Sequence, residues 1–179
     1  GLSMPIRMKN TCKGGLIEAI NAIVAASFSH VFPGFNQWGF ISRVKTTGNK
    51  TVRLILRGGD ETNYDRRSID EALERLEAKG LHPSLYVDLS HGNSKKKAIN
   101  QKIACMSIAR QIKHGYRGIA GVMIEGFFNN GNQPNTGDLE TMEYGTSITD
   151  ECLSIELTED LLIILNDAAA DGYEYRIAA

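Results

Sequence analysis

Short apolar runs alternate with amphipathic helical stretches along this chain, and four of the runs end in a charged or metal-binding side chain. The runs MPIRMKN, VRLILRGG, SLYVDLSHGN and AGVMIEG carry Lys9, Arg57, His91 and Glu125 at or near their ends. Strands that alternate with helices pair in parallel through right-handed crossovers. In an α/β barrel, the functional side chains lie at the carboxyl ends of the parallel strands. The pattern therefore predicts an α/β fold with these four side chains along one edge of its sheet.

Periodicity gives the expected order of elements. Period-two runs predict strands, and a 3.6-residue period predicts helices. Besides the run that ends at Arg57, we expect strands at residues 5–8, 30–35, 85–89 and 119–124, and helices at residues 16–26, 67–79, 98–113 and 157–170. Two β-rich runs on either side of Thr47-Gly48-Asn49 predict a β-hairpin. A polar loop rich in glycine and asparagine is expected from Asn129 to about Gly137.

The expected elements give about five parallel strands, fewer than the eight of a closed barrel. An open arc of this kind would leave two unpaired sheet edges, which soluble proteins avoid. We therefore expect either a fragment of a larger barrel or one half of a two-chain assembly. An independently folded doubly wound sheet is the alternative, although no GxGxxG fingerprint supports a dinucleotide-binding version of it.

Composition narrows the class of protein. The chain has 179 residues and a formal net charge of -1, which argues for one domain and against a general nucleic-acid binder. No run of about twenty apolar residues predicts a membrane span, and the first residues lack the pattern of a signal peptide. Three widely spaced cysteines, Cys12, Cys105 and Cys152, fit a reducing compartment. We expect a cytoplasmic protein.

Two of the strand-end residues suggest a metal. His91 continues the alternation of Leu85, Val87 and Leu89, so we expect it on the same face of its strand. Glu125 ends the following strand, and a carboxylate on an apolar face is costly unless it is paired or ligating. Two such residues on adjacent strand ends are explained together as ligands of one metal ion.

Asp150 is a third candidate ligand. It lies in YGTSITDEC, just before the last expected helix. Taken singly, Asp150 is interpreted as a helix cap, and His91 as a buried histidine bonded to backbone. Taken together with Glu125, they form a mixed nitrogen and oxygen donor set that suits Mn²⁺, Fe²⁺, Zn²⁺ or Co²⁺.

Lys9 and Arg57 are the candidate anion-binding residues. Arginine holds carboxylate or phosphate oxygens in a bidentate manner, whereas lysine offers a compact and mobile charge. Gly58 and Gly59 follow Arg57 and would let backbone amides approach an anion closely. A surface salt bridge is the alternative for each cation, and it is the weaker one for Arg57, which ends a strongly apolar run.

Several motifs, taken in order, carry a family resemblance. They are GLSMP followed by KN, ILRGG followed by NY, VDLSHGNS, GVMIEG, GNQ and YGTSITD. Together they resemble 3-deoxy-D-arabino-heptulosonate 7-phosphate (DAHP) synthases of type I, the bacterial and fungal class, over the whole chain. The match is to the C-terminal half of that family's (β/α)₈ TIM barrel. It implies that residues 1–179 are a partial TIM-barrel synthase domain with a β-hairpin insertion, whose N-terminal half is missing.

The resemblance also implies an activity. The family condenses phosphoenolpyruvate (PEP) with erythrose 4-phosphate, the first step of the shikimate pathway to the aromatic amino acids. By motif, Lys9 and Arg57 would bind PEP, and His91, Glu125 and Asp150 would be three of four metal ligands. Lys9 and His91 would also be catalytic, and Asp150 would also contact substrate. The fourth ligand, a cysteine, belongs to the N-terminal half and is not matched by any cysteine here.

Partners follow from the same resemblance. The family's aromatic feedback site includes residues near Leu2, Ser3, Phe32 and Gly34, and a glycine at position 34 resembles the tyrosine-sensitive members. We expect a homo-oligomer, and contact with the N-terminal half of the barrel. The family continues its KN motif with an acidic turn residue, which is replaced in Thr11-Cys12-Lys13.

Two alternatives to this function stay open. One is a Schiff-base aldolase that uses Lys9 as its nucleophile, because barrel strands do present such lysines. The other is a non-catalytic half-barrel that only binds its complementary half or regulates an intact subunit.

Overall fold

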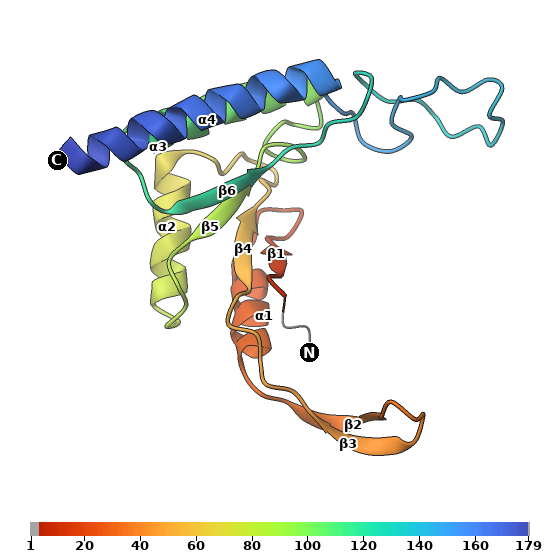
Figure 1. Cartoon of the computed structure of the whole chain (residues 1–179), viewed down its shortest axis with the longest axis vertical. Coiled ribbons are helices and arrows are strands. Elements are labelled where there is room, and N and C mark those ends of the chain that lie inside the picture. Colours follow the sequence, from red (N-terminus) through yellow and green to blue (C-terminus); the bar gives the residue numbers. More distant parts are fainter. Residues whose placement is uncertain (1–3, 179) are drawn as a thin grey trace.

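A four-stranded parallel sheet, in the order β1-β4-β5-β6, forms the centre of the molecule. The computed structural model describes residues 4–178. Each strand of this sheet leads to a helix, and an antiparallel hairpin lies between the first helix and β4 (Figure 1). The elements are β1 (Arg7–Lys9), α1 (Ile17–Ser27), β2 (Val31–Phe35), β3 (Ile41–Lys45), β4 (Arg53–Leu56), α2 (Arg66–Glu77), β5 (Leu85–Asp88), a 3₁₀ turn η1 (Ala98–Asn100), α3 (Gln101–Lys113), β6 (Ile119–Met123) and α4 (Ile155–Ala178).

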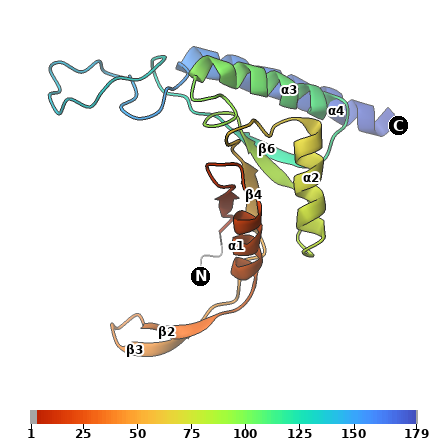
Figure 2. The same cartoon turned by 180° about the vertical axis from the view of Figure 1, so that it is seen from behind.

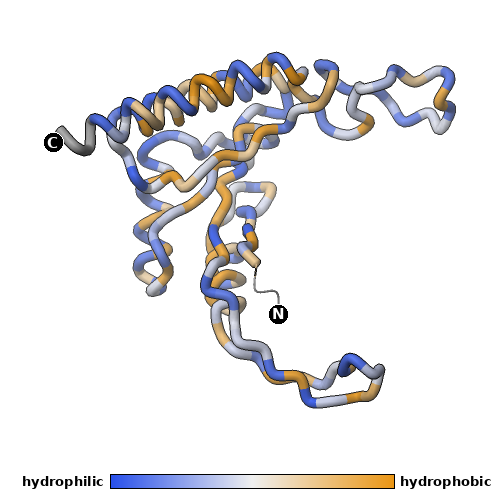
Figure 3. Tube along the Cα trace, in the orientation of Figure 1, coloured by the Kyte–Doolittle hydropathy of each residue, from blue (hydrophilic) through white to orange (hydrophobic). Residues whose placement is uncertain are grey.

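The two faces of the sheet differ in polarity. Alternation along β5 directs Leu85 and Val87 into the apolar core, where both are fully buried beneath the helices. Tyr86 and Asp88 point to the opposite face, where Arg7 of β1 stacks over the Tyr86 ring. The core side faces α1, α2 and α3, which lie in front of the sheet in Figure 2. Colouring by hydropathy separates the apolar strands from the mostly hydrophilic loop of residues 126–154 (Figure 3).

Local signals explain where α2 begins and ends. The side chain of Asp65 accepts a hydrogen bond from Ser68 N at 3.0 Å, which satisfies one of the free amides of the first turn. Burial alone would raise the pKa of Asp65, but the hydrogen bonds from Ser68 and the neighbouring amides hold it below its usual value of 3.8. The helix ends before Gly80, whose φ of 68° is the left-handed conformation that glycine tolerates.

The hairpin does not form where the sequence suggested. Thr47-Gly48-Asn49 is not its turn; instead, Asn49 packs on the end of α1 and donates its side-chain amide to Met4 O. The turn lies at residues 36–40, where Asn36 Oδ1 accepts from Trp38 N and Phe40 N at 3.0 Å each. An asparagine that bonds the backbone two residues ahead is a strong turn former, and the hairpin of β2 and β3 projects away from the sheet (Figure 1).

Two further expectations are corrected. The parallel sheet has four strands in the described chain, not five, because the run at residues 30–35 pairs antiparallel with β3 instead of joining β1. The expected face of His91 is also wrong. β5 ends at Asp88, and His91 lies beyond it with a φ of 50°, so strand alternation no longer sets its direction.

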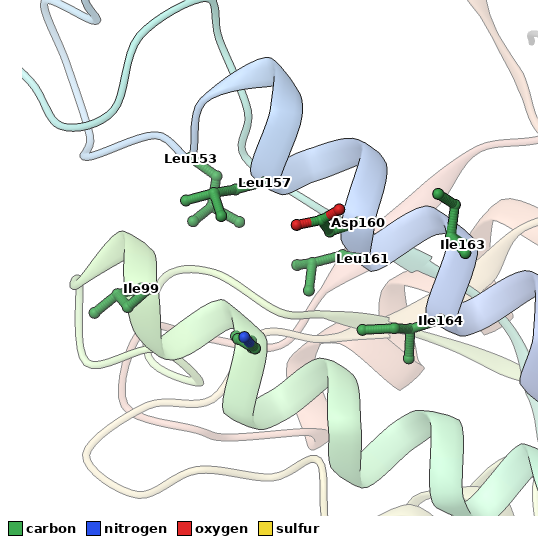
Figure 4. Close-up of a pocket in the computed structure, with 8 residues that line it drawn as sticks. Ile99, Leu153, Leu157, Asp160, Leu161, Ile163 and Ile164 are labelled. Carbon is green, nitrogen blue, oxygen red and sulfur yellow. The ribbon is translucent and has the colours of Figure 1, made fainter.

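Helix α4 packs along α3 at one side of the molecule (Figures 1 and 2). A hollow between them is lined mainly by leucine and isoleucine side chains, with Leu157, Leu161 and Ile164 of α4 facing the α3 side (Figure 4). None of the sequence-predicted site residues that the structure describes lines this hollow. Over residues 4–178, none of the helices has both the length and the apolar content that a membrane crossing needs.

Candidate functional site

Three side chains from different segments converge beyond the carboxyl ends of β5 and β6. One ligand atom from each of His91, Glu125 and Asp150 lies within 4.8 Å of the other two. His91 Nε2 is 3.4 Å from Glu125 Oε1 and 3.7 Å from Asp150 Oδ2. His91 and Glu125 are largely buried, whereas Asp150 is half exposed. The three predicted metal ligands are therefore brought together at one point.

A buried carboxylate beneath His91 sets the direction of its ring. Asp88 Oδ2 lies 2.9 Å from His91 Nδ1, although the angle at Nδ1 does not meet hydrogen-bond criteria. This contact leaves Nε2 pointing toward Glu125 and Asp150. The left-handed backbone at His91 costs a non-glycine residue about 1–3 kcal/mol, and such strain is concentrated at functional sites.

Glu125 is fixed by two polar side chains. Ser90 Oγ donates a hydrogen bond to Glu125 Oε2, which leaves Oε1 for the cluster. The fully buried Gln101 forms two hydrogen bonds with the backbone of Glu125. Its side-chain NH₂ group donates to Glu125 O and its side-chain carbonyl accepts from Glu125 N, both at 2.9 Å. The glutamate therefore enters the site from a rigid position.

The predicted anion-binding cations come from the ends of β1 and β4. Lys9 Nζ forms a 2.8 Å ion pair with Asp88 Oδ2, the same oxygen that faces His91. A nucleophilic role for Lys9 would require breaking this pair. Arg57 follows β4 and is half buried, and its Nη1 lies 3.5 Å from the Cys12 sulfur. Lys9 is the last residue of β1 and Arg57 directly follows β4, and these two strands are adjacent and parallel.

A network of asparagines joins the strand ends. Asn10 Oδ1 accepts from Arg57 N at 2.7 Å, Asn63 Oδ1 accepts from Gly58 N at 2.7 Å, and Asn93 Nδ2 donates to Asp88 O at 2.7 Å. These side chains replace the sheet ladder where the strands separate into loops.

Glycines allow the loops after β4 and β5 to meet. A Cβ at Gly58, whose φ is 69°, would lie 2.5 Å from Asn93 N, and a Cβ at Gly92 would lie 2.5 Å from Gly59 N. No side chain fits at such distances, so glycines at these positions allow the backbones of the Arg57-Gly58-Gly59 segment and the His91 loop to meet, with Gly92 N donating to Arg57 O at 3.0 Å.

Sequence reasoning missed Asp88, Asn10, Asn63, Asn93 and Gln101. A signal was available for four of them, since Asp88 interrupts an apolar strand and each asparagine stands at or near the end of a motif quoted above. Gln101 carries no signal, because a glutamine at the start of a helix is ordinary.

The predicted feedback residues are only partly described. Leu2 and Ser3 lie outside the described residues. Phe32 and Gly34 lie on β2, where a Cβ at Gly34 would come within 2.9 Å of Val44 Cγ2 on the paired strand. Both therefore belong to the projecting hairpin and not to the cluster around His91.

The donor set fits a divalent transition metal. When metal–ligand bonds are about 2.1 Å long, neighbouring ligand atoms lie roughly 3.0–3.4 Å apart. The distances from His91 Nε2 to Glu125 Oε1 and to Asp150 Oδ2 are close to this range. One imidazole and two carboxylates suit the metals expected from the sequence.

Of the cysteines, Cys105 is buried in the core, Cys12 contacts Arg57, and Cys152 lies near the cluster without joining it. Burial raises the pKa of the Cys152 thiol, and the charges of Glu125 and Asp150 act in the same direction.

Comparison with known proteins gives one consistent family. A model described as the DAHP synthetase I family matches residues 1–163. The Tyr-sensitive phospho-2-dehydro-3-deoxyheptonate aldolase of Escherichia coli (strain K12) is 44% identical over 162 residues, which cover 90% of this chain and 46% of that relative. The Phe-sensitive protein of the same strain is 40% identical over 168 residues, or 94% of this chain and 48% of that one.

A solved structure agrees with this result. The phospho-2-dehydro-3-deoxyheptonate aldolase of Francisella tularensis SCHU S4 superimposes with a TM-score of 0.89 at 33% identity, covering 96% of this chain and 50% of that chain. The chain thus spans about half the length of the relatives that it matches.

Proposed function

Because this chain belongs to the DAHP synthetase I family, we propose that it provides part of a metal-dependent DAHP synthase. The reaction condenses PEP with erythrose 4-phosphate and water to give DAHP and phosphate. The observation that carries the proposal is the convergence of His91, Glu125 and Asp150 beside Lys9. Relatives of similar sequence are named phospho-2-dehydro-3-deoxyheptonate aldolases, which supports the same reaction.

His91, Glu125 and Asp150 would hold the divalent ion, which we expect to be Mn²⁺, Fe²⁺, Zn²⁺ or Co²⁺. When bound, such an ion supplies Lewis-acid polarisation of the aldehyde carbonyl. Ser90 and Gln101 support this role, because they immobilise Glu125 and spare one of its oxygens. Asp150, the most exposed of the three, would also contact substrate.

Lys9 and Arg57 would bind the carboxylate and phosphate of PEP and hold its C2=C3 bond against the aldehyde. C3 of PEP then bonds to the aldehyde carbon, water adds to C2, and the C–O bond to phosphate breaks. The two cations contribute positioning and charge stabilisation. His91 is the candidate for proton handling beside them.

The fold we propose for the whole protein is a (β/α)₈ barrel, of which residues 1–179 are the C-terminal part. Four parallel strands with two free edges support this, because a closed barrel needs eight. The N-terminal half would supply the missing strands, the cysteine ligand and most of the erythrose 4-phosphate site. The half-length match to the relatives motivates the second candidate function, a half-barrel that is inert alone and acts only by binding its complement.

We also propose regulation and assembly typical of the family. Feedback by an aromatic amino acid, tyrosine in particular, would act through the β2–β3 hairpin with Phe32 and Gly34. Relatives named Tyr-sensitive and Phe-sensitive support the ligand class. The exposed Phe35, Trp38, Phe40 and Ile41 on this hairpin favour contact with another copy of the chain. We expect the protein in the cytoplasm.

The test combines this chain with the part of the E. coli Tyr-sensitive relative that it does not match. We expect PEP consumption and phosphate release from the mixture, loss of both on chelation, and recovery with Mn²⁺. Glu125→Gln in this chain should abolish turnover, whereas Glu140→Gln in the exposed loop is the matched control. Turnover that survives exhaustive chelation would contradict the metal assignment. A folded complex without turnover would favour the inert half-barrel.

A further inference from the structure

Asp88 lies between the two parts of the candidate site. Its side chain is completely buried and belongs to the polar face of β5, on the side away from the apolar core. The Oδ2 atom contacts both Lys9 Nζ at 2.8 Å and His91 Nδ1 at 2.9 Å. The Oδ1 atom accepts from Ser90 N at 3.0 Å. Both carboxylate oxygens are therefore engaged, and neither faces solvent.

A buried carboxylate with this environment is costly to maintain. Removing an ionised group from water costs several kcal/mol or more unless partners compensate. Packing does not require a charge here, because the neighbouring positions of β5 are filled by apolar or aromatic residues. Besides Ser90 N, the groups that compensate the charge are Lys9 and His91, which the proposed function needs for an anion and for a metal.

We propose that Asp88 is a positioning residue shared by the anion site and the metal site. Its Oδ2 atom, 2.9 Å from His91 Nδ1, favours the proton on that nitrogen, which leaves the Nε2 lone pair directed at Glu125 and Asp150. It also holds Lys9 Nζ at the carboxyl end of β1. This inference deepens the proposed function and rests on it for the role of Lys9 and of the cluster.

Hydrogen-bond partners of ligating histidines typically change metal affinity 10–100-fold when they are removed. Asp88→Asn keeps the shape of the side chain but removes its charge. Asparagine can present an NH₂ group to Nδ1 and thereby favour the opposite tautomer, with the proton on Nε2. In the variant, the nitrogen that faces Glu125 and Asp150 should therefore carry the proton and offer no lone pair to a metal.

The first measurement reads the tautomer of His91 in the wild-type chain. Long-range ¹H–¹⁵N spectra of the metal-free 179-residue chain report the tautomer of each neutral histidine, with His91 assigned through His91→Gln. We expect the Nδ1–H tautomer for His91 in the wild-type chain and a shift toward Nε2–H in Asp88→Asn. A wild-type His91 with its proton on Nε2 would overturn the proposal.

The second measurement follows Co²⁺ binding by its visible absorption. We expect Asp88→Asn to weaken Co²⁺ affinity roughly 10- to 100-fold. Val87→Ala is the matched control, because Val87 is equally buried on the same strand but faces the apolar core. It should lower the unfolding midpoint and leave both the tautomer and Co²⁺ affinity unchanged. Equal weakening by Val87→Ala would mean that Asp88 only supports the fold, and would overturn the inference.

A double-mutant cycle, measured by thermal unfolding, tests the link between Asp88 and Lys9. Lys9→Met and Asp88→Asn should each lower the unfolding midpoint, and the double variant should lose less than the two losses combined. Additive losses would overturn the shared role. The proposed function can fail separately: a wild-type chain with the Nδ1–H tautomer but no Co²⁺ affinity would reject the metal site while supporting the contact between Asp88 and His91.

Discussion

Glu125 is the residue whose role depends most directly on its contacts. Ser90 occupies one of its carboxylate oxygens, Gln101 fixes its backbone, and the other oxygen lies 3.4 Å from His91 Nε2. A carboxylate restrained in this way loses little further conformational entropy when it binds a metal. We therefore expect Glu125 to contribute more to metal affinity than Asp150, which is half exposed.

The corresponding prediction compares two ligands. Glu125→Gln should reduce Mn²⁺ affinity by more than about 100-fold, because losing a direct metal ligand costs more than losing a residue that only hydrogen-bonds to a ligand. Asp150→Asn should have a smaller effect. Isothermal titration of Mn²⁺ into the chain and its two variants measures both. A larger loss for Asp150→Asn would reverse this ranking.

The three cysteines should differ in reactivity. Burial raises the pKa of the Cys105 thiol to about 11, and the residue is enclosed in the core. Cys12 is exposed beside the Arg57 guanidinium. Because the thiolate is the reactive form, a maleimide at pH 7 should label Cys12 first and Cys105 only after unfolding. Mass mapping of labelled peptides over time measures the order, and early labelling of Cys105 would contradict the described core.

Four of the site residues identified from the sequence share one property. Lys9, Arg57, His91 and Glu125 all end or follow an apolar run, and such a charge is conspicuous without any knowledge of its neighbours. Asp88 also interrupts an apolar strand, but its role depends on a partner, Lys9, that lies 79 residues away in the sequence. Sequence patterns report local alternation, whereas the compensation of a buried charge depends on which strands become neighbours.

At the scale of elements, helices were predicted more reliably than strand partners. The expected helices overlap all four observed ones, because amphipathic spacing and end signals are local. Strand pairing is not local. The run at residues 30–35 has the pattern of any strand, and only the Asn36 turn decides that it folds back on β3. That turn signal was present in the sequence and was overlooked in favour of Thr47-Gly48-Asn49.

The cap of α2 gives a prediction at this scale. Asp65→Ala should reduce the free energy of unfolding by about 1 kcal/mol at pH 7, because one amide of the first turn loses its acceptor. The pKa of Asp65 is lowered in the folded state, so its contribution is present above 3.8 and is lost as the pH falls through the folded-state value.

Urea unfolding of the wild-type and Asp65→Ala chains at pH 7 and near pH 3 measures this difference. The difference in the free energy of unfolding between the two chains should be smaller at the lower pH. Asp60→Ala, in the preceding loop and outside the helix, is the control. A gap that stays constant with pH would mean that the charged carboxylate is not the cap.

At the scale of the whole molecule, the chain leaves apolar surface and sheet edges exposed. β1 and β6 are the outer strands of the described sheet. On the helices, Ile99, Ile103 and Met106 form an exposed stripe at helical spacing, and Leu162 and Ile163 of α4 are about half exposed. Unpaired edges and apolar patches of this kind normally lie against other protein. Together with the half-length match to relatives, they favour a complementary half.

This exposure leads to a prediction that does not depend on catalysis. The isolated chain should bind the dye ANS and self-associate with increasing concentration, because nothing in residues 4–178 covers the outer edges of β1 and β6 or the apolar stripe. Adding the unmatched part of the E. coli relative should suppress dye binding and give a one-to-one complex by sedimentation.

Lys9→Met should leave this complex intact, because Lys9 pairs within the chain, with Asp88. By contrast, Val122→Lys on β6 would place a charge on its core-facing side and should weaken the complex and the fold together. A chain that stays monomeric, binds no dye and does not bind the added half would contradict the half-barrel proposal. The four-stranded parallel sheet would then be stable without a partner.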